Sequence, residues 1–102
     1  DGIDVFFGGG TDYFLAKEAG GKRNDKRDLI VELKAAKYTY AASKADFDKL
    51  PVDGTTKVAG LFTKSHMAYD LDRDATKEPS LAEMTGKAID ALSARKNGFF
   101  LM

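Results

Sequence analysis

The sequence has no cysteine and a single histidine. The absence of cysteine excludes disulfides, thiolate catalysis and thiolate zinc sites, and it leaves the cellular compartment open. With His66 as the sole imidazole, a zinc site of two or three histidines cannot be built within these residues. A catalytic triad would need an activated nucleophile and an orienting carboxylate, and the adjacent Ser65 is poorly placed for proton transfer. We therefore interpret His66 as a loop or packing residue.

Net charge and long apolar runs are missing as well. Sixteen basic residues balance sixteen acidic ones, so no overall field would concentrate the protein on nucleic acid or on an anionic membrane. The lysines at positions 34, 37, 44 and 49 lack the clustered arginines and interleaved aromatics of a nucleic-acid surface. The longest apolar runs, such as residues 98–102, are too short to span a bilayer, and the first residues lack the pattern of an export signal. We expect no nucleic-acid partner, no membrane span and no export signal in these residues.

The composition is sufficient for one folded domain. The protein has 102 residues, of which 43% are apolar and 31% charged, a mixture that can bury a core and keep a wet surface. No internal repeat, low-complexity tract or long linker divides it. We predict that residues 1–102 form a single α/β segment.

Four apolar runs are typical of buried strands. They cover residues 3–7, 38–41, 58–62 and 99–102, and regions with helical patterns separate them. Their nearly continuous apolar character is typical of a parallel sheet covered on both faces. The predicted fold is therefore a three-layer α/β arrangement, with a mostly parallel sheet of about four strands, helices packed on it and right-handed crossovers.

Helices are predicted between these strands. A short helix is expected at residues 13–16, and a longer one from Asp25, with Asp25 as its cap. The apolar face of the longer helix would hold Leu29, Ile30, Leu33 and Ala36. Ser43 begins a third helix that ends before Pro51.

The strongest local signal begins at Ser80. Ser80 and Glu83 have the spacing of a capping box, in which the side chain of each residue accepts a hydrogen bond from the backbone N–H of the other. Apolar residues follow at helical spacing, and we interpret them as a core-facing stripe: Leu81, Met84, Ala88 and Leu92. Asn97 and Gly98 end this helix.

Two loops have partial ligand-binding patterns. Gly8, Gly9 and Gly10 follow a strand, as in phosphate-binding loops, but Tyr13 stands where a dinucleotide motif has glycine, and no P-loop Gly-Lys-Ser or Gly-Lys-Thr is present. We favour a plain strand-to-helix turn.

Residues 70–74 alternate carboxylates as a calcium loop does, but the turn glycine and the closing glutamate of an EF-hand are absent. We favour a solvated acidic loop there.

Three stretches, taken in order, resemble the middle of alkaline phosphatases. They are Asp-Val-Phe-Phe-Gly-Gly-Gly at residues 4–10, Gly-Leu-Phe followed by His-Met-Ala-Tyr-Asp and Arg-Asp within residues 60–74, and Pro-Ser-Leu-Ala-Glu-Met-Thr through Asn-Gly-Phe-Phe-Leu within residues 79–101. Together they extend over nearly all of the sequence. The third stretch is the most specific.

The resemblance implies a secreted or periplasmic homodimer that hydrolyses phosphomonoesters with two zinc ions, one magnesium ion and a serine nucleophile. In that family the serine and an early aspartate ligand precede the region matched by Asp4. The strand matched by residues 99–102 continues there into a Val-Glu-Gly motif and further metal ligands. The resemblance therefore places no catalytic, cofactor-binding or metal-binding residue in this sequence.

Animal-type members of the family also have a calcium site, whose ligands would match positions near Phe62, Thr63 and Glu78. Thr63 stands at the first carboxylate position and removes a charged ligand, whereas Glu78 keeps a carboxylate that is one methylene longer. A further ligand comes from upstream in the family. These departures weaken the case for calcium in this protein.

Two hypotheses follow. The first is an internal segment of a metal-dependent alkaline phosphatase, inactive alone, that looks cut from a larger enzyme because both of its ends are apolar strands. The second is an autonomously folding, non-catalytic structural or interaction domain. Unpaired apolar strands at the edges of the sheet also predict self-association of the isolated protein.

Overall fold

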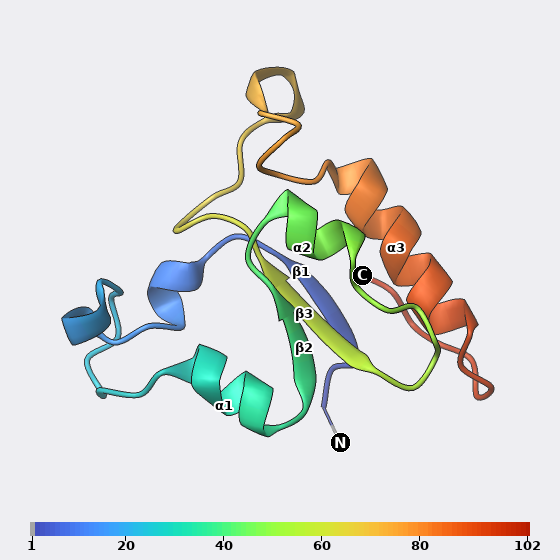
Figure 1. Cartoon of the computed structure of the whole chain (residues 1–102), viewed down its shortest axis with the longest axis horizontal. Helices are drawn as coiled ribbons and strands as arrows, with labels where there is room; N and C mark the ends of the chain where they lie inside the picture. Colours follow the sequence, from blue (N-terminus) through green and yellow to red (C-terminus); the bar gives the residue numbers. More distant parts are fainter. Residues whose placement is uncertain (1) are drawn as a thin grey trace.

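The computed structural model describes residues 2–102 and contains one parallel three-stranded sheet. The strands are β1 (Val5–Gly8), β2 (Tyr38–Ala41) and β3 (Lys57–Leu61), in the spatial order β1-β3-β2. β3 is central and pairs Val58 with Val5 on one side and with Thr39 on the other. The α/β fold class and the parallel sheet predicted from the apolar runs are thus confirmed (Figure 1).

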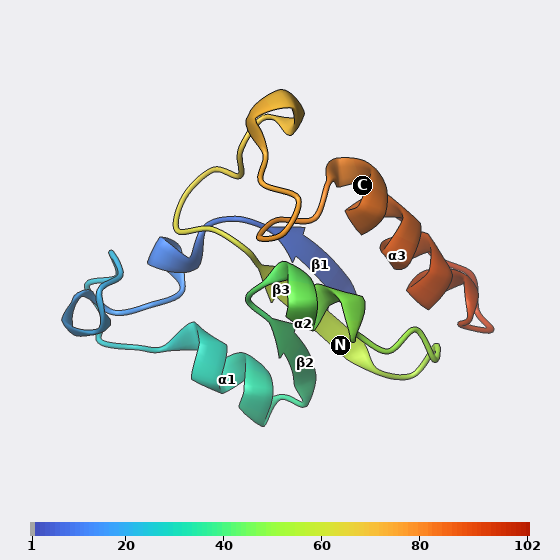
Figure 2. The ribbon, with the colours of Figure 1, turned by 45° about the horizontal axis from the view of Figure 1, so that its top comes forward.

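Three helices complete the segment: α1 (Leu29–Ala35), α2 (Lys44–Asp48) and α3 (Leu81–Ser93). Figures 1 and 2 show α1 beside β2 and α3 on the opposite side, next to β1. The Lys87 ammonium of α3 donates to the Phe47 carbonyl of α2 at 2.7 Å. Short 3₁₀ helices lie at Thr11–Tyr13, Lys17–Ala19 and Asp70–Asp72. None of the helices in the described part is long and apolar enough to cross a membrane.

The two faces of the sheet pack against different helices. Successive residues of a strand point to opposite faces, so Val5 and Phe7 share one face and Phe6 lies on the other. Phe7 contacts Phe47 of α2, with ring centres 5.3 Å apart. Tyr40 lies on the same face as Phe6, because both are in register with Ala59. On this face the Lys34 ammonium of α1 lies over the Tyr40 ring, 5.5 Å from its centre. The sheet is therefore the middle of three layers.

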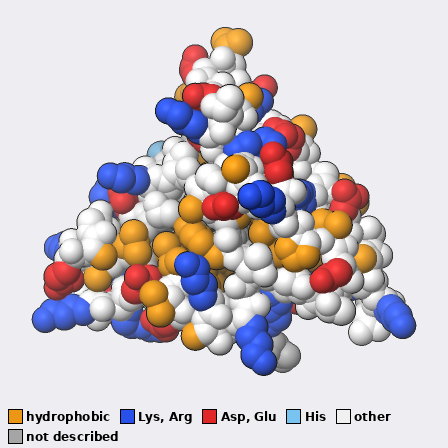
Figure 3. Space-filling view, in the orientation of Figure 1, with side chains coloured by type: hydrophobic (Ala, Val, Ile, Leu, Met, Phe, Trp, Pro, Cys, Tyr) orange, Lys and Arg blue, Asp and Glu red, His pale blue; other side chains and the backbone are white. Residues whose placement is uncertain are grey.

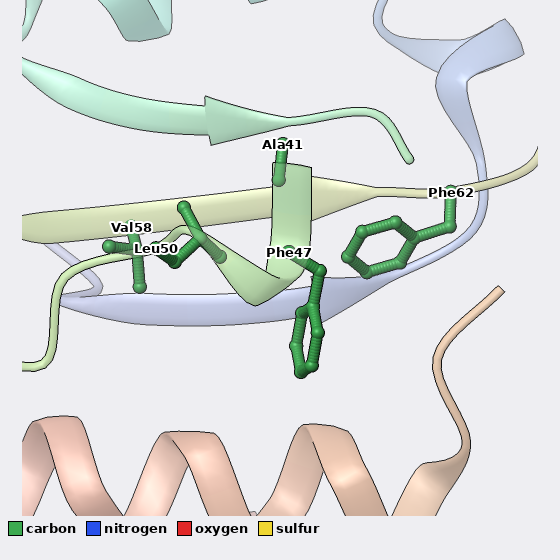
Figure 4. Close-up of a cluster of buried hydrophobic side chains, with 5 residues drawn as sticks. All are labelled: Ala41, Phe47, Leu50, Val58 and Phe62. Atoms are coloured by element: carbon green, nitrogen blue, oxygen red, sulfur yellow. The ribbon is translucent and has the colours of Figure 1, made fainter. Parts of the chain in front are cut away.

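The core lies between the sheet and α2. Its buried members are Ala41, Phe47, Leu50, Val58 and Phe62 (Figure 4). Gly60 makes room for this cluster, because a Cβ at that position would collide with the ring of Phe62 and lie 2.9 Å from the ring of Phe7. A small residue in the central strand is thus required by the aromatic packing around it.

Side-chain caps define the helix starts. The capping box at Ser80 and Glu83 is present as predicted, with the Glu83 N–H donating to Ser80 Oγ at 3.0 Å and the Ser80 N–H to Glu83 Oε1 at 2.9 Å. The predicted cap at Asp25 is wrong. Asp28 caps α1 by accepting from the N–H groups of Ile30 and Val31, whereas Asp25 is engaged by the guanidinium of Arg23.

Three further predictions are corrected. Residues 99–102 are not a fourth strand, and within residues 2–102 no backbone hydrogen bond joins them to β1. The side chains of this segment stay exposed, Phe100 to 86%, so it lacks the burial that stabilises a strand in the sheet. The helix at residues 13–16 is replaced by two 3₁₀ turns around it. Leu81 is 74% exposed and not part of the core, because it lines an apolar groove between β1 and α3 that is open to solvent.

Candidate functional site

The carboxyl ends of β1 and β3 lie at the same edge of the sheet, which is where α/β proteins place their functional loops. The loop after β1 is fastened to the loop after β3. The N–H groups of Gly10 and Thr11 both donate to the carbonyl of Thr63, at 2.9 and 3.1 Å, and the N–H of Asp12 donates to Lys64 at 3.0 Å. The amides of Gly10, Thr11 and Asp12 thus have backbone partners, and Gly8–Gly10 forms the turn from β1 into the 3₁₀ helix at Thr11–Tyr13.

Gly9 allows the close approach of the two loops. A Cβ at Gly9 would collide with the carbonyl oxygen of Ser65 and the hydroxyl of Thr63. Gly10 follows with a φ of 94°, a conformation that favours glycine. The glycine run is therefore explained by backbone geometry.

His66 lies at the same edge, in a small pocket of about 440 Å³ that Gly8–Gly10, Tyr13 and Ser65 also line. Its imidazole is exposed, and within residues 2–102 it takes part in no described ion pair or side-chain hydrogen bond. The structure thus places His66 in a loop, as predicted. Among the described residues, no carboxylate forms an ion pair with this imidazole, as the orienting carboxylate of a catalytic triad would.

The carboxylates of residues 70–74 serve local contacts. Asp70 pairs with Arg73 at 3.1 Å, and Asp74 accepts from both the N–H and the hydroxyl of Thr76, at 2.9 and 2.6 Å. These hydrogen bonds lower the pKa of the Asp74 carboxyl. The segment is an acidic loop that contains a 3₁₀ turn, as the missing EF-hand residues predicted.

The positions matched to a calcium site are also engaged in the loop. The hydroxyl of Thr63 donates to the Ser65 carbonyl at 3.0 Å, and the carboxylate of Glu78 accepts from the Ala68 N–H at 3.0 Å. Phe62 belongs to the core. Throughout residues 2–102, no group of three or more His, Cys, Asp or Glu residues is placed to hold a metal ion.

An ion-pair network, which the sequence did not indicate, joins α2, α3 and the acidic loop. Lys44 pairs with Asp48 at 2.6 Å and with Glu83 at 3.0 Å, and Arg73 lies 3.9 Å from Glu83. The Ser80 N–H and then Lys44 lower the pKa of Glu83 to about 2. Elsewhere on the visible face, basic and acidic groups are interspersed (Figure 3). Glu83 thus has two roles, as a cap and as the centre of this network.

A second cavity is an apolar groove of about 540 Å³ between β1 and α3. Residues 99–102, called the tail below, line it together with β1 and one side of α3. At one end Arg95 donates to the Thr56 carbonyl at 3.0 Å and lies 3.8 Å from the carboxylate of Asp4. The groove has the composition of a packing surface and no cluster of reactive groups.

Within residues 2–102, no backbone hydrogen bond is described along one edge of β1. Val58 and Phe62 of the neighbouring segment donate to the carbonyls of Asp4 and Gly8, each at 2.9 Å. Because strand residues alternate in direction, the backbone groups of Val5 and Phe7 point to the opposite edge. That edge and the apolar groove form a continuous surface suited to further packing.

Comparisons with known proteins give a consistent result. A family model described as alkaline phosphatase matches residues 1–102. Alkaline phosphatase 4 of Bacillus subtilis is 43% identical over 100 residues, which are 98% of the present sequence and 19% of that protein. Membrane-bound alkaline phosphatase of Bombyx mori is 39% identical over 109 residues, covering 95% of the present sequence and 20% of its own length.

Among solved structures, the alkaline phosphatase of Thermus thermophilus matches with a TM-score of 0.80 and 28% sequence identity. The match covers 96% of the present protein and 20% of the Thermus enzyme. The protein thus spans about a fifth of the length of the relatives it matches.

Proposed function

Because the chain belongs to the alkaline phosphatase family, we propose that it is an internal α/β segment of a phosphomonoesterase and is inactive alone. The observation that carries this proposal is the extent of the match. Nearly all of the sequence aligns with about a fifth of each relative, and the fold matches as well. The activity would belong to the complete enzyme, of which this segment supplies part of the scaffold.

The geometry at the carboxyl edge of the sheet supports this proposed scaffold role. The bonds from Gly10 and Thr11 to Thr63 hold the two edge loops in one position. The core around Phe47 fixes the strands that carry those loops. A rigid support of this kind is what precise placement of catalytic groups on neighbouring segments requires.

Zinc and magnesium are proposed for the complete enzyme on the basis of the family resemblance. The residues described here do not assemble a ligand set for either ion. Their ligands would therefore come from other parts of the enzyme, and no catalytic step is assigned to residues of this segment. A homodimeric enzyme and a periplasmic or secreted location are proposed on the same basis.

The proposal is tested with the purified segment and a chromogenic phosphomonoester. In buffer with zinc and magnesium, we expect turnover no faster than in buffer alone. Turnover that follows the protein through purification and disappears with a chelator would contradict the inactivity of the segment.

The alternative function, an autonomously folding non-catalytic domain, is supported by the closed core around Phe47 and Val58. It predicts a cooperative unfolding transition of the isolated segment. A folded, inactive protein is compatible with both hypotheses, so the segment exchange described at the end of the Discussion is needed to separate them.

A further inference from the structure

Asn97 and Gly98 form the connection between α3 and the tail. Asn97 is exposed, and Gly98 has a φ of 78°. The surroundings of Gly98 are open, because a Cβ placed there would meet no atom within 4 Å. Within residues 2–102, the described hydrogen bonds include none from the Asn97 amide group or the Gly98 N–H. The amide carbon of Asn97 and the backbone nitrogen that follows it are therefore both accessible.

From this geometry we propose that Asn97 is a site of spontaneous deamidation, with isoaspartate as one product. The Gly98 nitrogen forms a bond to Cγ of Asn97, the bond between Cγ and Nδ2 breaks, and ammonia leaves with the proton of the Gly98 N–H. Water then opens the resulting succinimide. Cleavage of the bond between the Gly98 nitrogen and Cγ gives aspartate, and cleavage at the former backbone carbonyl gives isoaspartate. The only co-reactant is water, and no oxidation is involved.

Asp53 and Gly54 provide a comparison within the same protein. Gly54 also has a positive φ, of 79°, but the carboxylate of Asp53 is held by its neighbours. It accepts from the N–H and hydroxyl of Thr55 at 3.0 and 3.2 Å, and from those of Thr56 at 2.9 and 2.8 Å. These bonds immobilise the carboxylate and favour its ionised form, which is a poor electrophile. The fold thus protects the Asp53-Gly54 pair and exposes the Asn97-Gly98 pair.

Asn24 is the second asparagine in the sequence, and it serves as an internal reference. It is also exposed, but Asp25 follows it. A substituent on the Cα of the following residue hinders attack by the backbone nitrogen. Exposure alone would make the two asparagines equivalent, whereas the succinimide mechanism requires reaction at Asn97 first.

The product would alter the path into the tail. Deamidation adds a carboxylate next to Lys96 and two residues from Arg95, the residue that holds the Thr56 carbonyl and lies near Asp4. Isoaspartate also lengthens the backbone by one methylene immediately before the tail. Because the tail lines the groove beside β1, the modification should change how the apolar side chains of the tail lie in that groove.

The experiment incubates the whole protein in mildly alkaline buffer. Isoelectric focusing, peptide mapping by mass spectrometry and labelling with an isoaspartyl methyltransferase follow the reaction. We expect a new species more acidic by one charge, with the modification at Asn97, no label at Asp53 and an unchanged Asn24. In urea, Asp53 should become labelled as well, since its bonds to Thr55 and Thr56 are lost.

The variant Asn97→Gln is the matched control, because the longer glutamine does not form the five-membered succinimide, and it should not give the acidic species. A synthetic peptide with the sequence of residues 93–102 provides the rate without the fold. If Asn97 stays intact in the folded protein while the peptide reacts, the fold protects it and the proposal is wrong. Deamidation of Asn24 as fast as that of Asn97 in the folded protein would also overturn it.

Discussion

Replacing Phe47 with alanine should remove a large part of the stability of this protein. The Phe47 residue is only 2% exposed. Its ring centre lies 5.3 Å from that of Phe7 and 5.7 Å from that of Phe62, and the Lys87 ammonium lies 4.7 Å from it. Truncation would leave a cavity where α2, β1 and the end of β3 meet.

The expected loss in the free energy of unfolding is about 3–5 kcal/mol, as for other buried phenylalanines. A protein of 102 residues has a total of roughly 5–15 kcal/mol, so Phe47→Ala should be close to unfolding at room temperature. Phe100→Ala is the matched control, because Phe100 is 86% exposed. That variant should change stability by no more than about 0.5 kcal/mol.

Urea unfolding followed by the near-ultraviolet circular dichroism of the tyrosines measures both variants. We expect a much lower urea midpoint for Phe47→Ala and an unchanged midpoint for Phe100→Ala. If both variants unfold at the wild-type midpoint, the aromatic cluster is not the core of this segment.

The remaining predictions concern Glu83, two glycines and the free sheet edge. The pKa of Glu83 is lowered to about 2, so the contribution of its carboxylate to stability should be complete above its usual pKa near 4.5 and lost as the pH falls toward 2. When the unfolding midpoint is measured at decreasing pH, Glu83→Gln should lose less stability than wild type. Equal losses in the two proteins would contradict this role of Glu83. Gly86→Ala should stabilise α3 by about 0.5–1 kcal/mol, because a Cβ at that position would have no atom within 4 Å. Gly60→Ala should destabilise the protein, because its Cβ would collide with the rings of Phe62 and Phe7. Thermal melts that rank the two variants in the opposite order would refute the packing argument. The unused edge of β1 predicts concentration-dependent self-association in sedimentation velocity, and a strict monomer at high concentration would count against it.

Local sequence patterns predicted much of the fold. The capping box of α3 uses residues three positions apart, and the strands carry continuous apolar runs, so both could be identified without tertiary information. The errors also have local causes. Asp25 and Asp28 are both suitable caps for α1, and the choice depends on Arg23, which engages Asp25.

The features that the sequence could not predict depend on distant contacts. The pair of Lys44 and Glu83 joins two helices that are far apart in sequence, and no pattern in either helix specifies the other. The bonds from the Gly10 and Thr11 amides to Thr63 required knowledge that β1 and β3 are neighbours. Only that pairing distinguishes a satisfied glycine turn from an open anion-binding loop.

The most direct test of the central claim is a segment exchange. The present segment would replace the matching stretch of alkaline phosphatase 4 of Bacillus subtilis, to which it is 43% identical. A second chimera would carry Gly9→Ala, which forces the loops after β1 and β3 apart, and a third would carry Gly86→Ala, which meets open space. All three would be assayed for turnover of a chromogenic phosphomonoester with zinc and magnesium, after circular dichroism has established that they are folded. We expect chelator-sensitive activity in the first and third chimeras and reduced activity in the second. A folded first chimera without activity would contradict the proposal that this segment is part of a phosphomonoesterase.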